Sequence, residues 1–302
     1  MEKRYSSEPA WASAEDQHPR GVPVVRNDRY WLYAEEAPEG WHITGVRANV
    51  EHGLEEVRVP AEVDGKPVLS LRMDWTYDPE HPAYVGQLYF PDCIPGVDGR
   101  SMRYVFRAIP EKTEHPCFME KENLLLTPDG KTVVAALVMY QRYYFVPDGV
   151  ENVAAYAFAE RRMDRVFLPG SLRSIGEQAF AGTFRLRGMV VPEGVTSIGD
   201  GAFADSGAVS VILPDSLEML GAGAFAGSDI LEVTIPPRVR KLKKTFMYCR
   251  DLCKLYLSEG LQEIGPYTFQ ACDNLRRIVL PQSVQRVDDN AFAECETEII
   301  RS

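Results

Sequence analysis

"VTSIGDGAFADS", residues 195–206, places Val195 and Ile198 three positions apart and follows them with a glycine and an Ala-Phe pair. This order suits neither one amphipathic helix nor one strand, because its apolar residues follow neither period. The same kind of stretch recurs along the chain, each time after a short apolar run. The recurrence, and not the stretch taken alone, decides the fold.

Seven copies of the pattern succeed one another at intervals of 22 or 23 residues. A proline marks the start of six copies, and Ser258 takes its place in the sixth. The copies begin at Val146, Leu168, Val191, Leu213, Ile235, Leu257 and Leu280. A unit this short is too small to bury a core of its own, so the units must stack on one another.

Within each unit, a β run such as "SVILP" (210–214) precedes the proline, which lacks an N–H donor and fits the end of a ladder. Gly199 is expected to permit a tight turn after Ile198. One phenylalanine of each unit is expected to fill the interior: Phe158, Phe180, Phe203, Phe225, Phe246, Phe269 and Phe292. The sequence therefore predicts an α/β repeat: a right-handed solenoid with a parallel sheet on one face and short helices or turns on the other.

The order of proline, Val/Leu, Ile-Gly, Ala-Phe and a Cys or Ser three residues after Phe resembles the BspA-type leucine-rich repeat. The resemblance covers residues 146–302 and extends more weakly to 41–46, 57–71 and 115–134. It implies a bacterial binding or surface-interaction solenoid, often extracellular, without common catalytic residues.

Residues 30–142 lack the 22-residue rhythm and are interpreted as an irregular cap with distorted coils. Asp129-Gly130 between two apolar runs predicts a β-hairpin over residues 126–138. Residues 1–29 are predicted to be a polar tail, and residues 143–302 to hold the seven regular repeats.

The charge balance and the hydropathy bear on location and partners. The 302 residues carry a net charge of −11, which argues against nucleic acid or an anionic membrane as the main partner. No window approaches the 18 apolar residues of a membrane span, and residues 1–21 contain no apolar run of the 7–15 residues that a secretory signal needs. We therefore expect a cytoplasmic protein without a membrane span.

The outward face of the predicted sheet is the main candidate site. If Val211 points inward, one outward column consists of Phe145, Phe167, Val190, Ile212, Thr234, Tyr256 and Val279. Beside it lie Tyr143, Arg165, Gly188, Ser210, Glu232, Lys254 and Arg277. A solvated face would be polar, whereas six of the seven positions in the first column are large and apolar or aromatic.

This column predicts a non-enzymatic scaffold that binds a protein or peptide. The preference of strands for β-branched and aromatic residues would by itself produce such a column, and the N-terminal segment could instead fold over it. The alternative function is a structural or self-associating solenoid that pairs through its C-terminal strand.

A basic cluster interrupts the acidic surface in the fifth unit, which lacks the glycine and is one residue short. An anion could bind there, although a charge run of this kind is more often a solvated face. The cluster contains Arg238, Arg240, Lys241, Lys243 and Lys244.

Cysteine and histidine motifs give no strong signal, and we predict no metal and no cofactor. Cys249, Cys272 and Cys295 recur once per coil, so at coil spacings of about 4.8 Å one zinc could not reach all three. They are interpreted as a ladder of small buried residues. A catalytic or metal site formed by His81, His115 and Cys117 is the third hypothesis, and proline turns explain both histidines as well.

Overall fold

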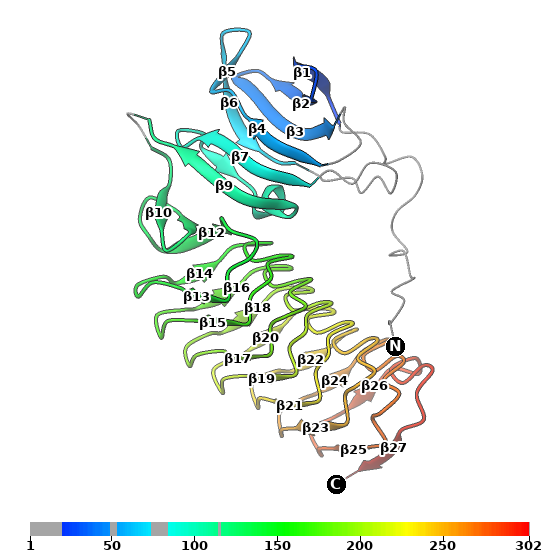
Figure 1. The fold of residues 1–302 in the computed structure, drawn as a ribbon. Coiled ribbons are helices and arrows are strands. Elements are labelled where there is room, and N and C mark those ends of the chain that lie inside the picture. Colours follow the sequence, from blue (N-terminus) through cyan, green and yellow to red (C-terminus); the bar gives the residue numbers. More distant parts are fainter. Residues whose placement is uncertain (1–19, 49–52, 74–83, 114–115, 302) are drawn as a thin grey trace.

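Residues 20–48, 53–73, 84–113 and 116–301 are described by a computed structural model of the protein. They form an elongated stack of coils with a group of β-strands at its N-terminal end (Figure 1). The stack of coils agrees with the solenoid that the repeats predict. Its right-handed sense stays a prediction.

One side of the stack is built from the strands that precede the prolines. Paired strands run parallel, and each pairing joins residues 21 or 22 positions apart, such as Tyr144 and Val166 or Val233 and Leu255. The strands are β13 (Tyr143–Phe145), β15 (Arg165–Phe167), β17 (Gly188–Val190), β19 (Ser210–Ile212), β21 (Glu232–Ile235), β23 (Lys254–Leu257), β25 (Arg277–Leu280) and β27 (Glu298–Arg301). Val211 is buried and Ile212 is exposed, so the predicted alternation between inside and outside is confirmed.

A second parallel ladder occupies the side where short helices were expected. Its members after the first are only two residues long, and each ends on an apolar residue, which a glycine follows in four of the seven. They are β12 (Thr132–Ala136), β14 (Asn152–Val153), β16 (Ser174–Ile175), β18 (Ser197–Ile198), β20 (Met219–Leu220), β22 (Lys241–Leu242), β24 (Glu263–Ile264) and β26 (Arg286–Val287).

The short helices of the predicted α/β class are therefore wrong for the described residues. Their only helical element is the 3-10 helix η1 (Gly99–Met102), which precedes the regular repeats. Turns, and not helices, connect the two ladders in the regular coils.

The repeated phenylalanines stack along the interior of the coils. The rings of Phe180 and Phe203 are 5.3 Å apart at their centroids and inclined by 2°, and the stacking continues from Phe158 to Phe292. Phe246 keeps its place although its unit lacks one residue. The interior position predicted for these rings is confirmed for all but the last, Phe292, which is only partly buried.

The glycine after Ile198 is required for a reason other than the expected turn. Gly199 does not have a positive φ. A Cβ on Gly199 would lie 2.6 Å from the backbone nitrogen of Glu177, and one on Gly221 would lie 2.3 Å from the carbonyl carbon of Gly199. Adjacent coils thus meet backbone to backbone at this position, and a side chain would force them apart.

Serine hydroxyls join neighbouring coils at the turn after the proline. Ser216 Oγ donates to the carbonyl oxygen of Val195 at 2.8 Å and accepts from the amide of Gly194 at 2.9 Å. The same contact pairs Ser171 with Gly149, and Ser283 with Gly260. The serine hydroxyl therefore forms hydrogen bonds with backbone groups of the preceding coil that would otherwise bind water.

The N-terminal region repeats the two-ladder plan in irregular form. Strands β4 (Leu54–Arg58), β7 (Val85–Pro91) and β9 (Val105–Glu111) are parallel, as are β6 (Lys66–Leu71) and β8 (Gly96–Val97). The region begins with β1 (Val22–Arg26), β2 (Tyr30–Ala37) and β3 (Gly40–Ala48), which pair antiparallel. The short β5 (Glu62–Val63) pairs antiparallel with β6. Residues 22–26 were expected in a polar tail and instead form an edge strand.

A hairpin joins the N-terminal region to the repeats. Strands β11 (Leu124–Leu126) and β12 pair antiparallel around Asp129-Gly130 as expected, and β10 (Met119–Lys121) adds a third strand. Leu124 packs into the core of the repeats and Leu125 into the core of the N-terminal region. The hairpin is thus buried on both faces, and the boundary predicted at residue 142 is crossed because β12 pairs with β14.

Arg161 connects the same two parts from within the core. Its guanidinium is buried and donates from Nη1 to the carbonyl oxygen of Val105 at 2.9 Å, and from Nη2 to the carbonyl oxygen of Met102. Burial lowers the pKa of Arg161 to about 10, so the group stays charged at neutral pH. Arg161 therefore donates to the carbonyl oxygens of Val105 and Met102, which would otherwise need water as a donor.

We expect Gly221→Ala to lower the free energy of unfolding by about 1–3 kcal/mol, because its Cβ would overlap backbone atoms of the preceding coil. Gly170→Ala is the matched control, since its Cβ would meet nothing within 4 Å. Urea denaturation measures both variants. Equal stability of the two would contradict the backbone contact.

We expect Arg161→Met to lower the free energy of unfolding by about 3 kcal/mol, because it leaves two buried carbonyl oxygens without a donor. The neighbouring exposed Arg162→Met should cost less than about 1 kcal/mol. Chemical denaturation followed by circular dichroism measures the difference. A loss as small as that of the control would refute the role given to Arg161.

Candidate functional site

The outward column of the repeat sheet is exposed to solvent along its length. The exposed fractions of Phe145, Val190 and Ile212 are 54%, 61% and 59%. Phe167, Tyr256 and Val279 are exposed as well, and so is Thr234, the one polar member. Strands about 4.8 Å apart give the seven positions a length of about 29 Å.

Two phenylalanines form the N-terminal end of this column. The rings of Phe145 and Phe167 stack at 4.8 Å with an angle of 6° between their planes. Because the rings face one another, they present their edges to solvent. Ring edges carry the positive part of the aromatic quadrupole, so they offer apolar surface together with a weak attraction for carbonyl and carboxylate oxygens.

Charged side chains border the column. Arg165, Glu232, Lys254 and Arg277 are all exposed, and Lys254 Nζ lies 3.5 Å from Glu232 Oε2. Ion pairs this exposed contribute little to stability. The arrangement of an apolar strip beside charges of both signs is that of an interface with a dry centre and a polar rim.

A second group of exposed rings lies at the start of the neighbouring strands. The rings of Tyr84 and Phe106 stack at 5.9 Å, and the ring of Tyr140 lies 5.5 Å from Phe106. The guanidinium of Arg162 lies 5.1 Å from the centre of the Tyr140 ring. Sequence reasoning missed this group, because Tyr84, Phe106 and Tyr140 belong to coils without the regular spacing.

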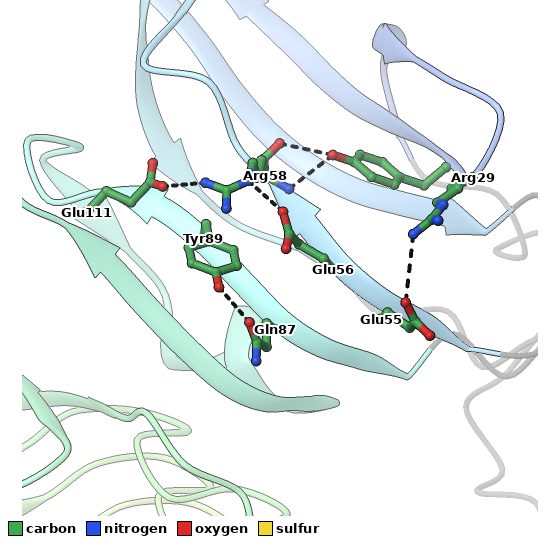
Figure 2. A network of polar contacts seen from close by, with 8 residues as sticks. Arg29, Glu55, Glu56, Arg58, Gln87, Tyr89 and Glu111 are labelled. Carbon is green, nitrogen blue, oxygen red and sulfur yellow. Dashed lines mark hydrogen bonds and ion pairs between the residues drawn. The ribbon is translucent and has the colours of Figure 1, made fainter.

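The outer face of β4, β7 and β9 is polar where these strands end (Figure 2). Arg58 Nε lies 2.5 Å from Glu56 Oε1, and Arg58 Nη1 lies 2.6 Å from Glu111 Oε1. The Arg58 guanidinium also lies 4.0 Å from the centre of the Tyr89 ring, whose hydroxyl donates to Gln87. The hydrogen bond to Glu56 raises the pKa of Arg58. These groups satisfy one another's hydrogen bonds and charges, as is typical of a polar face in contact with solvent.

Comparison with protein families matches the BspA-type leucine-rich repeat region, with six copies over residues 142–245 and 173–299. The chain belongs to the BspA-type leucine-rich repeat family. The match covers the coils that carry the exposed column. Comparison with curated proteins gives no match.

Solved structures of bacterial leucine-rich repeat proteins are similar to this chain. A leucine-rich repeat protein from Eubacterium ventriosum is 18% identical, with a TM-score of 0.62 over 81% of this chain and 65% of its own. A leucine-rich cell surface protein from Faecalibacterium prausnitzii is 17% identical, with a TM-score of 0.33 over 92% and 94%. The pneumococcal vaccine antigen PcpA is 12% identical, with a TM-score of 0.43 over 93% and 99%.

Of these three, the likeness to the Eubacterium protein supports the fold, and the fold alone. The chain spans about two thirds of the Eubacterium protein. No helix in the described part of the chain is long and apolar enough to cross a membrane. The cytoplasmic location expected from the sequence stays a prediction.

The basic cluster of the fifth BspA-type coil is partly neutralised by its neighbours. Arg238 Nη1 lies 3.0 Å from Glu218 Oε1, and Lys241 Nζ lies 3.1 Å from Glu263 Oε2. Arg240 donates to the carbonyl oxygen of Gly260 at 2.9 Å. Lys243 and Lys244 are exposed beside them. These contacts favour the solvated face, and anion binding by the cluster stays a prediction.

The repeated cysteines donate to backbone carbonyl groups of earlier coils. Cys249 Sγ lies 2.9 Å from the oxygen of Phe225, and Cys272 Sγ lies 3.1 Å from that of Phe246. Burial raises the pKa of the Cys249 thiol to about 12, so it stays protonated. In the part of the chain that the structure describes, no group of three His, Cys, Asp or Glu residues could hold a metal ion.

The proposed His/Cys site is only partly within the described residues. His81 and His115 lie outside them, while Cys117 lies inside them and is half-buried. Cys117 Sγ donates to the carbonyl oxygen of Cys93 at 3.1 Å. The Cys117 thiol therefore lies against the backbone of a second cysteine, which the sequence pattern did not indicate.

Proposed function

We propose that the protein is a non-enzymatic scaffold that binds a protein or peptide through the exposed column of its repeat sheet. The observation that carries the proposal is the strip from Phe145 to Val279, which is solvent-exposed in every coil and apolar or aromatic at every position except Thr234. Strips of this size on a soluble protein tend to be interaction sites.

The chemistry of the column favours a polypeptide partner. Aromatic side chains such as Phe145, Phe167 and Tyr256 are enriched at the centres of protein interfaces. The bordering charges are of both signs, so Arg165 and Glu232 select a partner of mixed charge. The stacked rings and paired charges are held by the parallel strands, which lowers the entropy lost on binding.

The test replaces Phe167 and Ile212 together by aspartate. Desolvated charges in the centre of an interface should reduce the affinity for a polypeptide partner at least about 30-fold, a loss of about 2 kcal/mol. Proteins captured by the immobilised full chain from bacterial lysate are identified by mass spectrometry. The partner found in this way is then titrated against each variant.

The matched control replaces Met219 and Tyr248, which are exposed apolar residues outside the column. Met219→Asp with Tyr248→Asp should leave both affinity and circular dichroism unchanged. Equal affinity of the column variant and the control variant for the captured partner would refute the assignment of this face.

A second candidate function is self-association through the last strand. Strand β27 pairs with β25 on one edge, and the side chain of Ile299 is 44% exposed. An exposed edge offers unpaired backbone groups to a second copy. This proposal predicts dimers in sedimentation at high concentration and monomers for Ile299→Lys. A monomeric unmodified chain would refute it.

A further inference from the structure

Cys93 and Cys117 lie together in the N-terminal region, 24 residues apart in the sequence. The amide of Cys117 donates to the carbonyl oxygen of Asp92 at 2.7 Å, and its thiol donates to the carbonyl oxygen of Cys93 at 3.1 Å. Both residues are half-buried and both thiols are free. The Cys117 thiol therefore rests against the backbone of the second cysteine while both remain within reach of solvent.

The segments that carry the two cysteines are fixed on either side. Asp92 is buried, and its Oδ1 accepts from the amide of Thr113 at 2.9 Å and from its hydroxyl at 2.6 Å. The Asp92 amide donates to the carbonyl oxygen of Glu111 at 3.0 Å. Ile94 is buried and Phe118 packs against the N-terminal core. The two cysteines thus keep their proximity without a covalent bond.

The other four cysteines lack this combination of proximity and access. Cys249 and Cys272 are fully buried within the coils, which denies oxidants access to their thiols. Cys295 donates to the carbonyl oxygen of the buried Cys272 at 3.2 Å. Cys253 is exposed and donates to the carbonyl oxygen of Leu231 at 3.4 Å.

We propose that Cys93 and Cys117 form a redox-sensitive modification site that closes to an intramolecular disulfide in the presence of a disulfide oxidant such as oxidised glutathione. The Cys93 thiolate attacks one sulfur of the oxidant, which releases one reduced glutathione and leaves a mixed disulfide on Cys93. The Cys117 thiolate then attacks the Cys93 sulfur and releases the second glutathione. Two protein thiols are oxidised, one glutathione disulfide is reduced, and the two protons end on the two glutathione thiols.

The order of attack follows from the surroundings of Cys117. Burial raises the pKa of its thiol, and the neighbouring Cys93 and Asp92 add to the effect. A thiol with a raised pKa is less often a thiolate at neutral pH, so Cys117 is the second to react, when the mixed disulfide is already held beside it. The bond would join the end of β7 to the segment that enters β10, and it would restrict the unfolded chain.

The experiment uses the full chain, purified in reductant and then equilibrated at pH 8 with mixtures of reduced and oxidised glutathione. After alkylation of the remaining thiols, mass spectrometry should show a species that has lost two hydrogens and carries no glutathione. Peptide mapping should locate the bond between Cys93 and Cys117. The oxidised protein should also unfold at a higher temperature than the reduced protein.

Two variants complete the test. Cys117→Ser should accumulate the mixed disulfide with glutathione at Cys93, whereas Cys253→Ser should form the intramolecular bond as the unmodified chain does. Circular dichroism shows that each variant is folded. Glutathione adducts alone in the unmodified chain, or a bond between any other two cysteines, would overturn the proposal.

Discussion

The contact between the backbones of adjacent coils is the constraint on which the rest of the structure depends. A Cβ on Gly199 or Gly221 would overlap atoms of the preceding coil, so these coils approach as closely as the main chain permits. The same approach is found at Gly176, 23 residues before Gly199, and strand pairing sets the side chains of these coils beside their counterparts. The stacked phenylalanines, the serine contacts and the two ladders all follow from this register.

The same register produces the candidate binding face. Strand pairing aligns Phe145 with Phe167 and Val190 with Ile212, so single apolar residues of separate coils become one strip. The network of Arg58, Tyr89 and Glu111 shows that outward positions of this fold also accept satisfied polar groups. The apolar strip is thus a property of the sequence of the repeats, and not of the fold.

The sequence was informative where one residue type recurs in every unit. The spacing of the phenylalanines predicted the stack, and the alternation around Val211 predicted the outward position of Ile212. The second ladder was missed because strands of two residues show no period. Arg161 was missed because its partners, Met102 and Val105, are carbonyl groups far away in the sequence, which no side-chain pattern reveals. The contact between Ser216 and Gly194 leaves one trace in the sequence: glycine and serine alternate between the first four units two residues after the proline.

Deletion of one complete coil tests the central claim most directly. Removal of residues 192–213 joins equivalent positions of two coils, so a stack held by register should close up, keep its circular dichroism per residue and unfold cooperatively. Removal of residues 192–202 takes away half a coil and should abolish cooperative unfolding, because inward and outward side chains no longer align. If the two deletions proved equally folded or equally unfolded, stacking in register would not be what holds this protein together.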